Sequence, residues 1–141
     1  EEKALLIAND ADSGVQVQVV DFRCNVLTLG AGATATSAIV KLYMVELAGL
    51  SASGTSASAK NALFGGAASV HTYHTSATAT ATATTALPLK LEASTVGGSV
   101  SLEILQKHPI IIPEGYALQA SVTGPAGSVP VVAIDYSAIE I

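Results

Sequence analysis

Apolar and polar residues alternate along several short segments, and this period of two constrains the fold more than any other feature of the sequence. The clearest case is residues 15–19, where three valines are separated by Gln16 and Gln18. Successive side chains of an extended chain point to opposite faces, so this alternation predicts a strand with one buried face. Glycine, proline and short polar residues separate such segments and mark turns. The pattern predicts an all-β chain.

The same reasoning gives about eight strands. The expected strands are residues 15–29, 37–47, 77–84, 88–91, 99–104, 110–112, 116–122 and 129–141. Residues 37–47 carry apolar side chains on both faces, which is typical of a central strand, and residues 124–127 suit a hairpin-type connection. No amphipathic helical period appears. We therefore expect a single domain over residues 1–141, an antiparallel β-sandwich that is jelly-roll-like.

Two segments differ from this pattern. Residues 1–9 form an extended N-terminal segment, and residues 48–89 are rich in Ala, Ser and Thr, with Lys60 as their one charged side chain before Leu89. Within the second segment, residues 77–84 repeat Ala-Thr, which would place every threonine on one face of a strand. Packing of this strand against a neighbour is the favoured interpretation. Disorder stays open, because alanine buries too little area to offset chain entropy.

Charged residues are scarce. They make up 12% of the chain, roughly half the usual fraction for a soluble domain, while 50% of the residues are apolar and 4% aromatic. A surface so poor in charge is most easily explained if neighbouring subunits cover much of it. The net charge is −5, and the basic residues are isolated, which argues against direct nucleic-acid binding. They are Lys3, Arg23, Lys41, Lys60, Lys90 and Lys107. No apolar run approaches the roughly 18 residues of a membrane helix.

Residues that could carry chemistry are few. His71 and His74 are the best metal candidates, but positions three apart on a strand point to opposite faces, and hydrogen-bonded histidines are the better interpretation. Asp10 and Asp12 lack the downstream Glu of a calcium loop and suit a turn. The single Cys24 is expected to be a small buried side chain. We predict no catalytic residues, no cofactor and no metal site, and hence no enzyme.

The second half of the chain supports a family resemblance. Residues 109–122, with the sequence Pro-Ile-Ile-Ile-Pro-Glu-Gly-Tyr followed by a strand, and residues 129–141 resemble the small all-β structural proteins of decoration or cement type in tailed bacteriophage virions. Residues 13–17 and 50–55 are also similar. The resemblance implies a virion protein, made in the host cytoplasm, that binds and stabilises the outer face of the phage head, often as a trimer.

The expected partners are therefore further copies of the chain, as a homotrimer, and the major capsid protein lattice. The Ala-Thr repeat would pack between subunits, and residues 1–9 would reach the shell. The expected interface residues are Leu5, Leu6, Ile7, Ala77, Thr78, Ala79, Thr80, Ala81, Thr82 and Ala83. A phage neck, tail or host-adhesion subunit and a non-viral trimeric jelly-roll binding domain remain alternatives.

Overall fold

The computed structural model describes residues 2–30, 35–47, 55–58, 67, 69–75, 84–94, 96–102, 105, 107–125, 128 and 130–141. In these residues the all-β prediction is confirmed, since they form ten strands and no α-helix. The strands are β1 (Glu2–Asn9), β2 (Val17–Thr28), β3 (Ala38–Glu46), β4 (Thr55–Ser58), β5 (Thr72–Thr75), β6 (Thr84–Ala93), β7 (Ser99–Ser101), β8 (Ile110–Ile112), β9 (Tyr116–Thr123) and β10 (Val131–Glu140). Within the described residues, no helix is long and apolar enough to cross a membrane.

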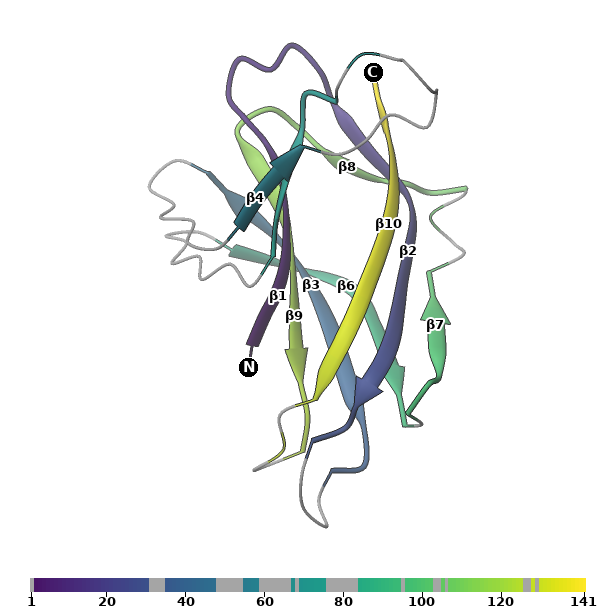
Figure 1. Ribbon diagram of the computed structural model, residues 1–141. Coiled ribbons are helices and arrows are strands. Elements are labelled where there is room, and N and C mark those ends of the chain that lie inside the picture. The colour runs from purple at the N-terminus through teal and green to yellow at the C-terminus, as the bar shows by residue number, and fades with distance from the viewer. Residues whose placement is uncertain are drawn as a thin grey trace.

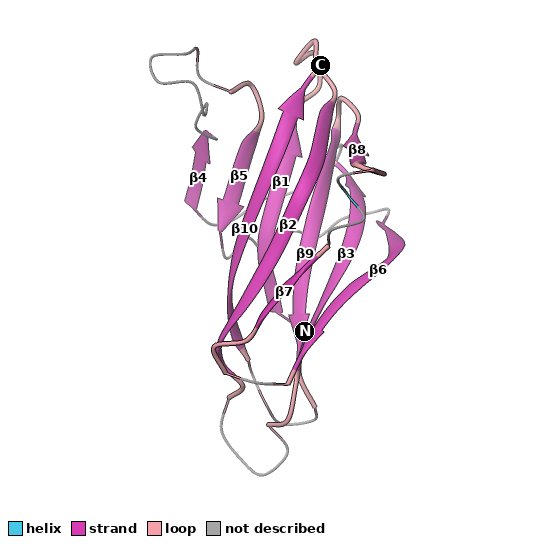
Figure 2. Cartoon of the chain, turned by 90° about the vertical axis from the view of Figure 1, so that its right-hand side faces the viewer, coloured by secondary structure: helices cyan, strands magenta, loops and turns pink. Residues whose placement is uncertain are grey.

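The strands form two antiparallel sheets that face one another (Figures 1 and 2). Six strands follow the order β4-β5-β1-β9-β3-β6, and the other sheet follows β10-β2-β7, with β8 also paired to β2. The β-sandwich prediction is therefore confirmed. Three of the ten strands, β1, β4 and β5, lie in segments where no strand was expected. Jelly-roll connectivity stays a prediction.

The core lies between the sheets and takes side chains from both. The six-stranded sheet contributes from β1, β3 and β9, and the four-stranded sheet from β2 and β8. Phe22 of β2 is the largest side chain that is fully buried. Alternation along β2 produces this arrangement, because Val17, Val19, Phe22 and Cys24 are all buried. The buried side chains change from odd-numbered to even-numbered positions between Val19 and Phe22, where the register with β10 shifts.

Most predicted strands agree with the structure. β3 lies between β9 and β6, as expected of a central strand, and β10 closes the chain. Val15 precedes β2 instead of belonging to it, and β7 ends at Ser101 although the alternation continues to residue 104. In β8, Ile111 is exposed while its two neighbours are buried, so the run that the sequence suggests is buried on one face only.

The N-terminal expectation is wrong. β1 is an inner strand of the six-stranded sheet, paired with β5 on one side and β9 on the other. Leu5, Leu6 and Ile7 are buried within the subunit, with exposed fractions of 6%, 0% and 0%. Such a strand cannot reach out to a shell, because its apolar side chains already complete the core. Residues 77–83, the other part of the expected interface, lie outside the described residues.

The connection after β9 also differs from the prediction. A hairpin at residues 124–127 would make β9 and β10 neighbours in one sheet. Instead, β9 pairs with β1 and β3, whereas β10 pairs with β2. The chain therefore crosses between the sheets here, and the core-facing residues of β10 pack against the core cluster from the layer opposite β9.

Replacing Phe22 by alanine should lower the free energy of unfolding by about 3–5 kcal/mol, since it empties a fully buried site between the sheets. Urea denaturation followed by circular dichroism measures this. The matched control is Leu27→Ala on the same strand, where the side chain is 58% exposed and the expected loss is below about 0.5 kcal/mol. Equal losses would contradict the assigned core.

Candidate functional site

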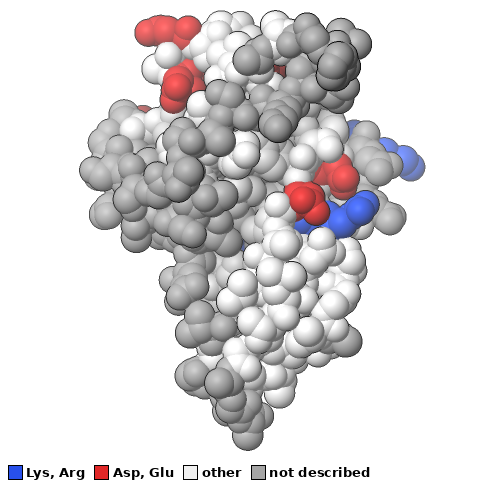
Figure 3. Space-filling view, viewed as in Figure 1, with Lys and Arg blue, Asp and Glu red and all other residues white. Residues whose placement is uncertain are grey.

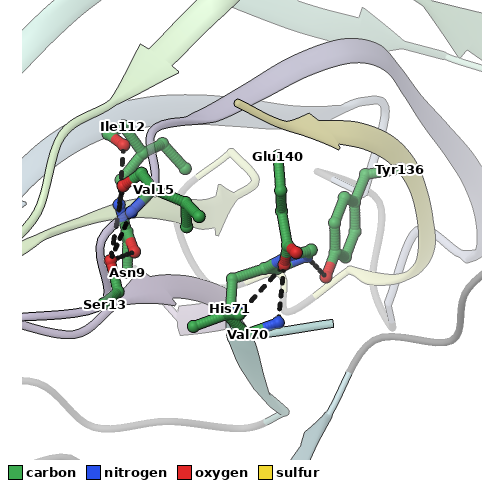
Figure 4. Close-up of polar contacts among 8 residues, drawn as sticks. All are labelled: Asn9, Ser13, Val15, Val70, His71, Ile112, Tyr136 and Glu140. Carbon is green, nitrogen blue, oxygen red and sulfur yellow. Dashed lines mark hydrogen bonds and ion pairs between the residues drawn. The ribbon is translucent and has the colours of Figure 1, made fainter. Parts of the chain in front are cut away.

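The most concentrated polar cluster joins His71 to the end of β10 (Figure 4). The Nδ1 atom of His71 lies 2.6 Å from Oε1 of Glu140, and its Nε2 lies 3.1 Å from the hydroxyl of Tyr136. The same carboxylate oxygen accepts hydrogen bonds from the backbone N–H groups of Val70, at 2.8 Å, and His71, at 3.0 Å. We call His71, Tyr136 and Glu140 the clasp.

The clasp connects the two sheets. His71 directly precedes β5 in the six-stranded sheet, and Tyr136 and Glu140 lie on β10 in the other sheet. Two edge-to-face ring contacts support it, with centroids 5.9 Å apart between His71 and Tyr136 and 6.3 Å apart between Tyr73 and Tyr136. The side chain of His71 is only 4% exposed. The clasp therefore holds the start of β5 in one sheet against the last strand of the other.

Hydrogen bonding sets the charge state of Glu140. Burial raises the pKa of this carboxyl group, but donation from the His71 backbone, the His71 ring and the Val70 backbone outweighs burial. The pKa of Glu140 is consequently lowered from its ordinary value of 4.5. An ionised carboxylate can only accept, so Nδ1 of His71 carries the hydrogen and donates to it. In the neutral ring, Nε2 then accepts from the Tyr136 hydroxyl.

This order of carboxylate, imidazole and hydroxyl is also that of a catalytic relay, in which the imidazole takes the proton of the attacking hydroxyl. Burial first, and then the neighbouring Tyr73 and Glu140, raise the pKa of Tyr136 to about 12. Both ring nitrogens of His71 are engaged, and the ring is buried. The arrangement fixes two strands relative to one another.

A second polar cluster surrounds Asn9, which is completely buried (Figure 4). Its Nδ2 donates to the carbonyl oxygens of Val15, at 2.9 Å, and Ile112, at 3.1 Å, and its Oδ1 accepts from Ser13 at 2.6 Å. Its backbone carbonyl accepts from Gly115 at 2.9 Å. Asn9 therefore ties the end of β1 to the loop before β2 and to both ends of the turn between β8 and β9.

The other residues that the sequence offered as metal candidates are the two histidines and the two aspartates of residues 10–12. His71 takes part in the clasp, whereas His74 lies one residue beyond Tyr73, which packs against the core, and so points to the opposite face of β5. Asp10 and Asp12 are exposed in the turn after β1, where Asp12 has a φ of 65°.

Cys24 is buried, and burial raises the pKa of its thiol to about 11. The described part of the chain contains no group of three His, Cys, Asp or Glu side chains placed to hold a metal ion.

Sequence reasoning missed three participants, namely Asn9, Tyr136 and Glu140. Their partners lie far away along the chain, since Glu140 contacts a residue 69 positions away and Asn9 one 103 positions away. Only an amide at the end of an apolar strand and a carboxylate in an apolar C-terminal strand could have indicated them. Neither feature identifies a partner.

Comparison with known proteins adds no relative: no family model, no curated protein and no solved structure matches this chain.

Replacing Glu140 by glutamine should lower the free energy of unfolding at neutral pH by about 1–2 kcal/mol, since the buried His71 loses a charged acceptor. Because folding lowers the pKa of Glu140, its contribution is complete above pH 4.5 and is lost as the pH falls below this value. The difference between wild type and variant should therefore shrink in acid. Urea denaturation across the pH range measures it.

Glu114→Gln is the control, because Glu114 is exposed in a turn. It should change stability little at any pH. A Glu140→Gln variant as stable as wild type at neutral pH would contradict the clasp as a stabilising contact.

Replacing Asn9 by alanine should cost about 2–4 kcal/mol, because two carbonyl oxygens and one hydroxyl lose their partner and the amide site empties. Thermal unfolding and amide hydrogen exchange of the turn around Gly115 measure this. Ser13→Ala removes one of these bonds at a partly exposed position and should cost about 1 kcal/mol. If both variants lost the same stability, Asn9 would have no special role.

Proposed function

We propose that the chain is a virion structural protein, a capsid decoration protein that binds and stabilises the outer face of a phage head as a homo-oligomer. Support comes from the resemblance of residues 109–122 and 129–141, from the β-sandwich fold and from the distribution of charge. The observation that carries most weight is an uncharged end of the sandwich with exposed apolar side chains.

This end, which we call the neutral tip, consists of residues 26–30, 35–38, 96–100, 123–125 and 130–132. Three charge-free stretches of sequence meet here, residues 24–40, 93–102 and 115–134. Pairing brings them together, since Val131 lies opposite Thr28 and the N–H of Gly97 donates to Val26. Figure 3 shows charged side chains in the upper and middle parts of the molecule and none in the lower part of this view.

Three large apolar side chains are exposed at the neutral tip. Leu27 is 58% exposed, Val96 57% and Val131 47%. They surround the same segment of β2, because Val131 pairs with the residue after Leu27 and the turn at Val96 bonds to the residue before it. Clusters of exposed apolar side chains without charge mark contact surfaces. A flat, neutral protein surface such as a capsid shell suits this chemistry.

A contact made by so few side chains is weak by itself. Stable protein interfaces bury on the order of 1,600 Å² in total, far more than three side chains supply. A capsid repeats its binding sites, so an oligomer that docks several tips at once gains affinity by multivalency. In this proposal the neutral tip takes the docking role expected of residues 1–9, because Leu5, Leu6 and Ile7 are buried inside the subunit.

Substituting lysine for Leu27 or Val96 should reduce occupancy on purified phage heads by at least about tenfold, because docking would bury an unpaired charge. Quantitative gel analysis of particles after addition of the purified protein measures this. The matched control is Ile111→Lys, which places the same charge at an exposed apolar position on β8, beside Gln18 near the opposite end of β2.

Two negative results have different meanings. Wild-type protein that fails to bind heads, and is absent from virions, contradicts the proposed function. Wild-type binding with unchanged occupancy of Leu27→Lys and Val96→Lys contradicts only the assignment of the neutral tip.

A further inference from the structure

β10 forms one edge of the four-stranded sheet and pairs with β2 on one side only. In Figure 1 it runs along the front of the molecule, with β2 beside it. It is ten residues long, while the other strands at sheet edges, apart from β6, have three or four residues. No strand among the described residues pairs with its second side. A long open edge offers a row of backbone groups to another strand.

Backbone parity shows which amides of β10 face the open side. Gln16 and Ile141 exchange both hydrogen bonds, so the N–H of odd-numbered residue 141 points to β2. Both register shifts skip a residue of β2, Val20 or Leu27, and none of β10. The alternation in β10 is therefore unbroken, and its even-numbered N–H and C=O groups point away from β2.

The bonds on the far side of β2 confirm this parity. Beyond the first shift, Phe22 accepts from Leu102 and Val26 exchanges bonds with residues 97 and 98. In this part of β2, the backbone N–H and C=O groups of the even-numbered residues thus point to β7. Those of the odd-numbered Asp21, Arg23 and Asn25 point to β10. Their partners there are residues 137, 135 and 133. The open groups accordingly belong to Val132, Ile134, Tyr136 and Ala138.

The side chains at these even positions face the core but are incompletely covered. Val132, Ile134, Tyr136 and Ala138 pack against the core cluster, yet each keeps an intermediate exposure. Core-facing residues of the inner strand β2, such as Val19 and Phe22, are fully buried. The core therefore lacks cover along the β10 edge. An added strand would supply both the missing hydrogen bonds and the missing cover.

Proteins that must keep a long edge unpaired protect it with lysine, proline or bulges in the edge strand. β10 contains no lysine and no proline. Both bulged residues belong to β2. The charged residues of β10 are Asp135, on the exposed face, and Glu140, which the clasp holds. Among the described residues, none pairs with the second side of the middle of β10.

We propose that β10 of a second copy of this chain pairs with β10 in antiparallel orientation, which joins two four-stranded sheets into one across a two-fold axis. A two-fold axis at Ile134 brings the open groups of even-numbered residues together, because it sets Ile134 against Ile134 and Val132 against Tyr136. Asp135 then lies opposite Ala133 of the second copy. An axis at residue 135 would set the two Asp135 carboxylates against each other, and an axis at Tyr136 would require Glu140 to pair.

A second copy is the partner that the geometry favours. Its β10 carries the same open row of N–H and C=O groups and the same half-covered apolar residues, so one contact satisfies both strands. Such a self-complementary contact is the ordinary form of a two-fold dimer. The pairing gives a dimer, in place of the homotrimer that the family resemblance implies. Because the two β10 strands run antiparallel, the two neutral tips of this dimer point in opposite directions, so the dimer docks one tip on a shell, and docking of several tips would need further copies. The test of the pairing is independent of capsid binding.

Amide hydrogen exchange measured by NMR at low and high protein concentration tests the pairing. The N–H groups of Val132, Ile134 and Tyr136 should exchange rapidly in dilute solution and become protected as the dimer forms. Those of Ala133, Asp135 and Ser137 should be protected at both concentrations, because β2 binds them. Light scattering after size exclusion gives the mass of the species in the same samples.

The register is tested by two opposite charges at one position of intermediate exposure. Ala133→Lys would lie opposite Asp135 of the second copy and strengthen the dimer, and Ala133→Asp would weaken it. Each dimer contains two such pairs, so the dissociation constants of the two variants should differ roughly tenfold. Melting curves in dilute solution check that both subunits fold alike.

A gain of protection with concentration that is restricted to the even-numbered amides, together with a dimer mass, supports the proposal. A monomer at millimolar concentration, a trimer, or a dimer whose even-numbered amides exchange rapidly would overturn it. Equal dissociation constants for Ala133→Lys and Ala133→Asp would overturn the pairing in this register.

Discussion

The hydrogen bonds of β2 hold one whole layer of the sandwich together. β7, β8 and β10 are all paired to β2. Its side chains from Val17 to Val26 also supply most of the core surface of that layer. Two bulges let the strand keep its apolar side chains inward while serving three partners, because each bulge changes the face that a residue presents. Both sheet packing and the neutral tip depend on this strand.

Residues distant in sequence secure the parts that β2 does not reach. The clasp fastens the start of β5 to the end of β10, and Asn9 fastens β1 to β8 and to two loops. Both clusters use buried polar groups whose partners are all present; the described residues contain no buried side-chain nitrogen or oxygen without one. Such networks favour a single arrangement of the chain, since any other packing would leave polar groups unpaired.

The scarcity of charge has two structural consequences. At the neutral tip it leaves Leu27, Val96 and Val131 exposed among residues of which none is charged. Along β10 it leaves a long edge with Asp135 as the only charged side chain outside the clasp. A solitary protein would gain solubility from charge at both places. The proposed capsid contact and the proposed dimer each account for one of these surfaces.

Local periodicity was sufficient to predict the all-β class and most strands, because the alternation of Val17 and Val19 or of Leu118, Ala120 and Val122 reflects burial directly. It also identified Cys24 as a core side chain. Pairing could not be predicted from it. β1 has the same apolar character whether it is a docking arm or an inner strand, and the segment after Thr123 has the same turn residues in a hairpin or a crossover. The partners of His71 and Asn9 lie 69 and 103 residues away. Sequence determined which segments form strands with a buried face, since the alternation of side chains is local, whereas tertiary structure alone decided which strands meet, since that depends on packing between distant segments.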